Sequence, residues 1–340
     1  PRAVADEGMW LLNAPPVAMI EREHDFSPSP EWFEHLQKSA CKFGASASFV
    51  SPDGLVLTNH HVARSQLAKL STPEHDLLKA GYLAQARADE LRCPDATLYC
   101  LQDIVDVTDR VKLAGAGTWT LAEEGAKRRA AIAAIEIEAN GESGLHCDVV
   151  TLYEGGLYHL YRYKRFTDIR VVFAPEGDIA HFGGDVDNFE YPRFCLDMTL
   201  LRVYDDDGEP YHPEHFLKFS TAGVSDGEPV FVVGHPGSTQ RQYTTDHLRF
   251  LRDVSYPRRL HQIRTREVEL RVLSSQGDEE ASIAARDLMG YQNGRKGLGG
   301  KLRALQDPRV FALKVEDEND FRRRIAQRQD LQQLVGTAFE

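Results

Sequence analysis

The segment most informative about the fold reads ASASFVSPDGLVLTNHHV and covers residues 45–62. Two short runs that favour strands, SASFV and LVLT, flank a turn-forming Ser-Pro-Asp-Gly at 51–54, which predicts a β-hairpin. The second strand ends at Asn59, His60 and His61. Reactive side chains are often placed where a rigid strand gives way to a loop, so this end of the hairpin is a candidate functional site.

Working outward, the sequence alternates further strand signals with helical insertions. Helical patterns are expected near 66–92 and at 121–139, the second rich in Ala, Glu, Lys and Arg. Strands flanked by Gly, Pro or Asp are expected at 147–153, 157–163, 168–174, 197–204 and 229–234. A mainly antiparallel β domain with α insertions accounts for this order.

The character of the chain changes after about residue 244. The remainder is charged, favours helices and has almost no β runs. We therefore expect a β domain over residues 1–245 and the start of an α-helical domain over 246–340.

Composition excludes several classes of function. The 340 residues carry a net charge of −12, whereas phosphate binding needs clustered Lys and Arg, so no nucleic-acid partner is expected. No run approaches the roughly 20 apolar residues of a membrane span. The chain starts at Pro1 without a basic and apolar leader, which leads us to expect a mature or trimmed form.

Five cysteines are too scattered for a disulfide scaffold or for a zinc site of CxxC type. Cys93 and Cys100 could form a disulfide in an oxidising compartment, and ordinary buried thiols fit equally well. The redox compartment therefore stays open.

His61 and Asp197 are the candidate acid-base pair. In chymotrypsin-like proteases a histidine at a strand end accepts the proton of the nucleophile, and a half-buried aspartate fixes its tautomer. Asp197 opens an apolar strand run, and His61 holds the last place of the strand-end motif. His60 competes for the role of base, because adjacent residues of a strand face opposite ways and only one can reach a cleft.

The nucleophile is missing from this pattern. A Gly-x-Ser-Gly turn is expected downstream of Asp197, and none follows. Ser143 precedes Asp197 and fits a loop after a helix, while Ser238 fits a strand-to-loop corner. The 13 histidines show no HExxH pair and there is no phosphate-binding loop, so no metal and no organic cofactor are expected.

Five ordered blocks resemble the bacterial dipeptidyl-peptidase 7 and 11 family of serine peptidases. They are DEGMWLL (6–12), SFVSPDGLVLTNHH (48–61), STPEHDLLKAGYLAQARADEL (71–91), HFGGDVDNFEYPRFCLDMTLLRVY (181–204) and VVGHPGSTQR (232–241). The resemblance implies a chymotrypsin-like double β-barrel with an inserted helical domain. Family members are about twice as long, with the nucleophilic Ser in a Gly-Asn-Ser-Gly-Ser turn near their C-terminus, so this chain would hold the first barrel and the start of the helical domain.

The same resemblance suggests substrate-binding residues. An Asn that helps to hold the substrate's free α-amine corresponds to Asn188, and Asn293 is the candidate for a further Asn from the helical domain. Amide oxygens are acceptors that an ammonium needs. Phe189 stands where the family has Trp, which keeps an apolar wall of different size, and Val62 replaces a Cys, which removes a disulfide option near the base.

The expected function is a serine dipeptidyl-peptidase, inactive as these 340 residues alone, acting on peptides with a free N-terminus. The resemblance also implies a periplasmic or secreted protein and leaves a homodimer possible. Two other interpretations are an endoprotease of the high-temperature-requirement type and an inactive peptidase-like binding protein. The helical region after residue 245 speaks against the first of these, and the sequence beyond Glu340 decides the second.

Overall fold

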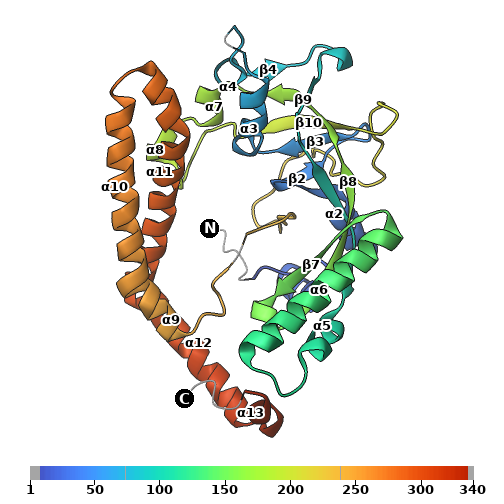
Figure 1. The fold of residues 1–340 in the computed structure, drawn as a ribbon, viewed down its shortest axis with the longest axis vertical. Helices are drawn as coiled ribbons and strands as arrows, with labels where there is room; N and C mark the ends of the chain where they lie inside the picture. The colour runs from blue at the N-terminus through green and yellow to red at the C-terminus, as the bar shows by residue number, and fades with distance from the viewer. Residues whose placement is uncertain (1–7, 73, 238, 336–340) are drawn as a thin grey trace. The chain divides into compact units, whose positions relative to one another are not determined.

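The computed structural model describes residues 8–72, 74–237 and 239–335 (Figure 1). It divides into two compact units that are each discontinuous in sequence. The first contains Pro1–His181 and Cys195–Gly237, and the second contains Phe182–Phe194 and Ser238–Glu340. The predicted single boundary at residue 245 leaves the short segment 182–194 in the β domain, whereas in the structure this segment belongs with the helices.

The first unit is built on one ten-stranded sheet in which every strand pair is antiparallel. The strand order is β4-β9-β10-β3-β2-β1-β6-β8-β7, and β5 also pairs with β9. The strands are β1 (Ala40–Phe43), β2 (Ala45–Phe49), β3 (Leu55–Thr58), β4 (Tyr82–Leu83), β5 (Leu91–Arg92), β6 (Leu98–Asp106), β7 (His146–Leu152), β8 (Leu157–Phe166), β9 (Asp168–Ala174) and β10 (Thr199–Tyr204). The expected fold class, mainly antiparallel β with inserted helices, is confirmed.

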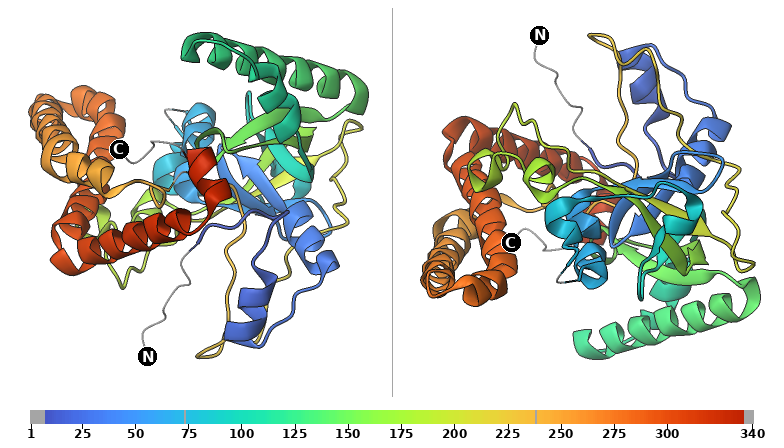
Figure 2. Two further views of the ribbon diagram at one scale, coloured as in Figure 1. Left: turned by 90° about the horizontal axis from the view of Figure 1, so that it is seen from below. Right: turned by 90° about the horizontal axis from the view of Figure 1, so that it is seen from above.

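The helices of the first unit precede β1 or lie between later strands in the chain. The longest, α6 (Leu121–Ser143), starts at a capping box in which the Thr120 hydroxyl and the Glu123 carboxylate satisfy free backbone N–H groups. It packs against β7, as the green helix in both views of Figure 2 shows. The others are α1 (Val17–His24), α2 (Pro30–Ser39), α3 (His60–Leu70), α4 (Leu77–Ala80), α5 (Thr108–Gly115) and α7 (Gly177–Ala180).

The predicted hairpin is β2 and β3, and it lies at the centre of the sheet. Phe49 and Val56, one from each strand, are fully buried in a core shared with Ile169 and Leu201 of β9 and β10. Truncating a side chain of this kind to Ala typically costs about 2–5 kcal/mol. The hairpin is therefore fixed by its own turn and by the neighbouring strands.

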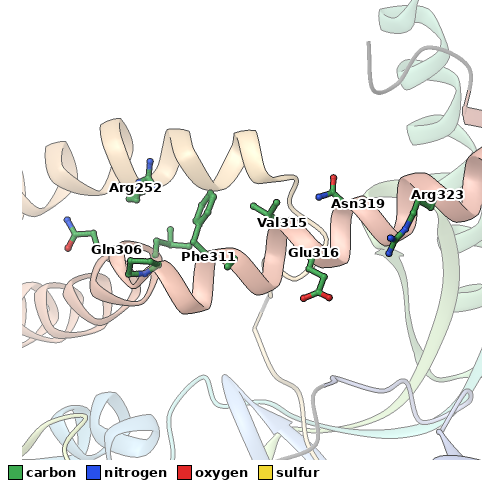
Figure 3. Close-up of a pocket in the computed structure, with 10 residues that line it drawn as sticks. Arg252, Gln306, Phe311, Val315, Glu316, Asn319 and Arg323 are labelled. Atoms are coloured by element: carbon green, nitrogen blue, oxygen red, sulfur yellow. The ribbon is translucent and has the colours of Figure 1, made fainter.

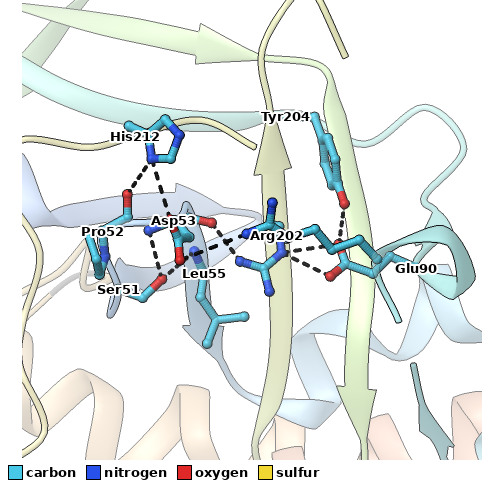
Figure 4. A network of polar contacts seen from close by, with 9 residues as sticks. Ser51, Pro52, Asp53, Leu55, Glu90, Arg202, Tyr204 and His212 are labelled. Atoms are coloured by element: carbon cyan, nitrogen blue, oxygen red, sulfur yellow. Dashed lines mark hydrogen bonds and ion pairs between the residues drawn. The ribbon is translucent and has the colours of Figure 1, made fainter. Parts of the chain in front are cut away.

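A polar network holds the hairpin turn in place (Figure 4). Arg202 of β10 donates to both oxygens of Glu90 and to the Asp53 carbonyl, and the Tyr204 hydroxyl donates to Glu90 at 2.7 Å. The Glu90 side chain is almost fully buried, so this pairing satisfies a charge that would otherwise be costly. Burial and the Glu90 carboxylate raise the pKa of Tyr204 to about 12.

Three local expectations were wrong. Residues 229–234 form no strand, because no neighbouring strand supplies the hydrogen bonds that an extended segment needs. The region 66–92 is not one helical insertion: it contains the end of α3, the short α4, and the strands β4 and β5. The strand before His60 leads directly into helix α3 rather than into a loop.

The second unit is helical. Helices α10 (Tyr256–Ser274) and α11 (Asp278–Gln306) pack along each other as a long hairpin, visible in orange in Figure 1. Tyr256, Leu260 and Leu298 form its small core. The remaining elements are α8 (Gly184–Asp187), α9 (Thr245–Phe250), the π-helical turn η3 (Leu251–Ser255), α12 (Pro308–Ala326) and α13 (Gln329–Val335).

Candidate active site

His61 and Asp197 meet at the start of helix α3. The His61 Nδ1–H lies 2.7 Å from Asp197 Oδ2, and the His61 backbone N–H donates to Asp197 Oδ1 at 2.9 Å. Asn59 completes the arrangement, because its side-chain amide donates to the Asp197 carbonyl at 3.0 Å and to Oδ2 at 3.3 Å. The Asp197 carboxylate is thus held from three directions.

The helix itself favours this position for a carboxylate. The first N–H groups of a helix lack partners inside it, and its N-terminal end carries partial positive charge. Helix α3 has no acidic residue in its first turn, and Asn59 makes no side-chain cap. Asp197, which lies just before β10, therefore acts as the cap from a distant part of the chain.

The structure distinguishes the two adjacent histidines. The whole His60 residue is 3% exposed, whereas the His61 side chain is 65% exposed. His60 Nε2 is buried without a hydrogen-bond partner in the described part of the chain. Only His61 can reach a molecule outside the fold while its other ring nitrogen stays bound to the carboxylate.

The electrostatics of the pair agree with its geometry. The hydrogen bond to Asp197 is the main reason that the pKa of His61 is raised above its ordinary value. Burial alone would raise the pKa of Asp197, but the hydrogen bonds from His61 outweigh it and lower that pKa. The ionised Asp197 carboxylate and the His61 proton that it binds thus stabilise each other.

A pocket opens beside this carboxylate within the first unit. It has a volume of about 370 Å³ and is lined in part by Asn59, Asp197, Met198 and Phe219. Its mixture of apolar walls and a few polar groups is typical of small-molecule and peptide sites.

The other predicted residues gather in the second unit. The Asn188 side-chain amide donates to Asn293 Oδ1 at 3.1 Å, and Arg193 donates to Asn188 Oδ1 at 3.0 Å. Phe189 follows with φ of 61°, a backbone conformation that bulky residues rarely adopt, and its ring packs near Gly297 of α11. Strained positions of this kind cluster at functional sites.

Sequence reasoning missed the residues that hold this segment on α11. Arg295 binds Glu267 of α10 through Nε at 2.9 Å and Asp185 of α8 through Nη2. The next residue, Lys296, donates to the Val186 carbonyl at 2.8 Å. The one sequence feature that could have indicated these contacts is the GRKG run beside Asn293. Two adjacent basic residues on a charged helix usually lie on its solvent-exposed face, so the run was not singled out.

A larger cavity of about 590 Å³ lies elsewhere in the second unit (Figure 3). Arg252, Phe311, Val315 and Asn319 are among its lining residues. None of the predicted site residues lines it.

Among the described residues, no serine is placed as a nucleophile for His61. The Ser143 hydroxyl donates to the Ala139 carbonyl at 2.7 Å at the end of α6, which is the role of a helix-terminal serine. Ser238 lies outside the described residues. Over residues 8–72, 74–237 and 239–335, no serine hydroxyl hydrogen-bonds the His61 ring.

Two negative findings concern metals and membranes. Among the described residues, His, Cys, Asp and Glu side chains nowhere gather in the groups of three or more that would hold a metal ion. Within the same residues, no helix has the length and apolar character of a membrane span.

Comparisons with known proteins agree with the fold. A family model described as Peptidase S46 matches residues 5–340. An Asp/Glu-specific dipeptidyl-peptidase of Shewanella putrefaciens is 32% identical over 94% of this chain and 46% of its own length. Dipeptidyl-peptidase 7 of Phocaeicola vulgatus is 30% identical over 93% of this chain and 47% of its own.

Solved structures are similar as well. The crystal structure of Porphyromonas endodontalis DPP11 with the dipeptide Arg-Asp aligns with a TM-score of 0.79 at 24% identity, covering 95% of this chain and 50% of that one. The chain thus spans about half the length of the relatives that it matches.

Proposed function

Because the chain belongs to the peptidase S46 family, we propose that it is the N-terminal part of a serine dipeptidyl-peptidase that releases dipeptides from the free N-terminus of peptides. The observation that carries this proposal is the hydrogen bond between His61 Nδ1 and Asp197 Oδ2 at 2.7 Å. The nucleophilic serine would lie in chain that follows Glu340, in a second half of a chymotrypsin-like double barrel.

In this mechanism His61 is the general base. Its Nδ1–H is bound to Asp197, so the exposed Nε2 has the free lone pair that accepts the proton of a serine hydroxyl. Asp197 keeps the ring in this tautomer and stabilises the imidazolium that forms. His61 then returns the proton to the leaving amine.

Asn188 and Asn293 would anchor the α-amine of the substrate. Each side-chain oxygen in the pair already accepts one hydrogen bond and has a second lone pair for an ammonium. An exopeptidase must recognise a charged terminus at a fixed distance from the scissile bond, and two aligned amides on a clamped segment suit that task. Phe189 would supply an apolar wall beside them.

We test the activity with the protein carrying all the chain that its gene encodes. Chromogenic dipeptidyl substrates are offered with free and with acetylated N-termini. We expect cleavage of the free substrate only, and no hydrolysis by residues 1–340 alone. Equal rates on the two substrates would indicate an endoprotease, and no cleavage of either would favour an inactive peptidase-like binding protein.

Localisation and assembly are part of the same proposal. We infer a periplasmic or secreted protein that forms a homodimer from the resemblance of the sequence blocks to the dipeptidyl-peptidases. Cell fractionation checks the first inference, and light scattering of the purified protein checks the second.

A further inference from the structure

Two of the five cysteines lie directly opposite each other on neighbouring strands. Cys41 of β1 is the registered partner of Cys100 of β6 in an antiparallel pair. Opposite residues in such a pair have Cα atoms about 4.5 or 5.5 Å apart, and both values fall inside the range of about 4.4–6.8 Å that a disulfide requires. The register therefore meets the distance condition without movement of the backbone.

The junction between β1 and β6 is a narrow part of the sheet. Only two residue pairs join these strands, Cys41 with Cys100 and Lys42 with Tyr99. On one side lie the hairpin and β10, and on the other lie β6, β8 and β7. A covalent bond here would connect the two sides where only two residue pairs join the strands.

The folded sheet encloses both thiols. Cys41 is 0% exposed and Cys100 is 4% exposed. An oxidant therefore reaches the two sulfur atoms only before β1 and β6 have closed.

Neither Cys93 nor Cys147 has a cysteine as its registered strand partner among the described residues. A Cys93–Cys100 disulfide was an open alternative from the sequence; all five cysteines are free thiols in the structure, and the strand register places Cys100 opposite Cys41 rather than Cys93. Burial and the charge of Asp168 raise the pKa of Cys93 to about 12, which makes it a poor nucleophile. Cys147 contacts the Ser143 hydroxyl at 3.4 Å.

We propose that Cys41 and Cys100 are a dithiol site that forms a disulfide across β1 and β6 when the protein folds in the presence of a disulfide oxidant. The proposal rests on the strand register and is independent of the peptidase activity. It gives the β-domain a cross-link where its backbone pairing is narrow.

The chemistry balances with a disulfide RS–SR as the two-electron oxidant. The Cys100 thiolate attacks one sulfur of RS–SR, which forms a mixed disulfide and releases the first RS⁻. The Cys41 thiolate then attacks the Cys100 sulfur, which closes the bond and releases the second RS⁻. The protons of the two thiols end on the two released RS groups. Because both thiols are buried in the folded sheet, the reaction occurs before β1 and β6 close.

The test is a cysteine map of the protein with all its encoded chain, refolded in oxidised and reduced glutathione. Free thiols are alkylated in denaturant, and the digest is analysed by mass spectrometry. We expect Cys41 and Cys100 peptides joined, with a mass about 2 Da below the sum of the two free-thiol peptides, and Cys93 and Cys147 alkylated. Quantitative alkylation of Cys41 and Cys100, or a Cys93–Cys100 bond, would overturn the proposal.

Stability gives a second measurement that does not depend on the map. Reductant should lower the Tm of the oxidised protein by roughly 5–10 °C, because the loss of the cross-link frees the unfolded chain. The Cys93→Ala control should show the same fall, and the double variant C41A/C100A should show none. An equal response of the double variant would mean that the cross-link lies elsewhere.

Discussion

At the residue scale, the pairing of His61 with Asp197 is the feature on which the proposed function depends. The sequence motif favoured His61 over His60, and the exposure of the two rings gives the physical reason. What the motif could not reveal is that Asp197 also caps helix α3, because that contact joins residues 136 positions apart. Local patterns identify reactive residue types, whereas their partners depend on the tertiary fold.

The pair makes a prediction about pKa that can be measured on the imidazole itself. Asp197→Asn should lower the His61 pKa towards its ordinary value, since the carboxylate that stabilises the proton is gone. Titration of the ring protons by NMR measures the change. Asp226→Asn, which changes an exposed carboxylate, should leave the His61 pKa unchanged, and an unchanged value in the Asp197 variant would contradict the account.

The same shifts give a sign for the pH dependence of stability. The raised pKa of His61 adds stability that is complete below its unfolded value and is lost as pH rises through the folded value. The lowered pKa of Asp197 adds stability that is present above its unfolded value and is lost as pH falls through the folded value. The pair therefore stabilises the fold most between the unfolded values of Asp and His, about 3.9 and 6.5.

At the element scale, the central hairpin was predictable and its surroundings were less so. The turn at 51–54 and the alternation of the flanking residues are local, and β9 at Asp168–Ala174 has the predicted bounds. Residues 229–234 have the same apolar composition as a strand, and Gly234 lies close to Ser46 of β2, but in the described part of the chain no strand pairs with their backbone. Strand formation depends on a neighbour that the local sequence does not reveal.

Gly54 tests the importance of the hairpin turn. It has φ of +69°, and a Cβ there would lie 2.6 Å from the Tyr211 carbonyl oxygen and 2.9 Å from that of Val203. Gly54→Ala should lower the free energy of unfolding by about 3 kcal/mol, from backbone strain and the close approach together. Urea denaturation measures the loss.

Gly208 is the matched control for this substitution. It has φ of +81°, but a Cβ there would meet nothing within 4 Å. Gly208→Ala should therefore lower the free energy of unfolding by backbone strain alone, about 1 kcal/mol. Equal losses for the two variants would show that the contact of the turn with β10 and Tyr211 is unimportant.

At the scale of the whole molecule, long-range ion pairs that the sequence does not display join segment 182–194 to the helical unit. Segment 182–194 interrupts the β domain in sequence, yet it belongs to the helical unit. Arg295 links it to α10 and α11 through Asp185 and Glu267. The composition alone indicated a change from strand-favouring to helix-favouring sequence near residue 245. It gave no sign that segment 182–194 belongs to the helical unit.

Arg295→Met should release this segment. The change leaves the half-buried Asp185 and the buried Glu267 without their cation, a loss of about 3 kcal/mol in the local stability of the helical unit. Hydrogen exchange of residues 184–190 should become faster. Arg309→Met is the control, since Arg309 is exposed and pairs with Asp307, and protection of 184–190 should be unaffected by it. Unchanged exchange in the Arg295 variant would contradict the role of the clamp.

The most direct test of the account is the kcat/KM of the protein, with all its encoded chain, on a dipeptidyl substrate with a free N-terminus. His61→Ala should lower this value by at least about 10³-fold, because no other described side chain can act as the base bound to Asp197. His75→Ala, which removes an exposed histidine outside the pair, should leave it within twofold. A His61→Ala protein that retains more than a tenth of the activity would contradict the assignment.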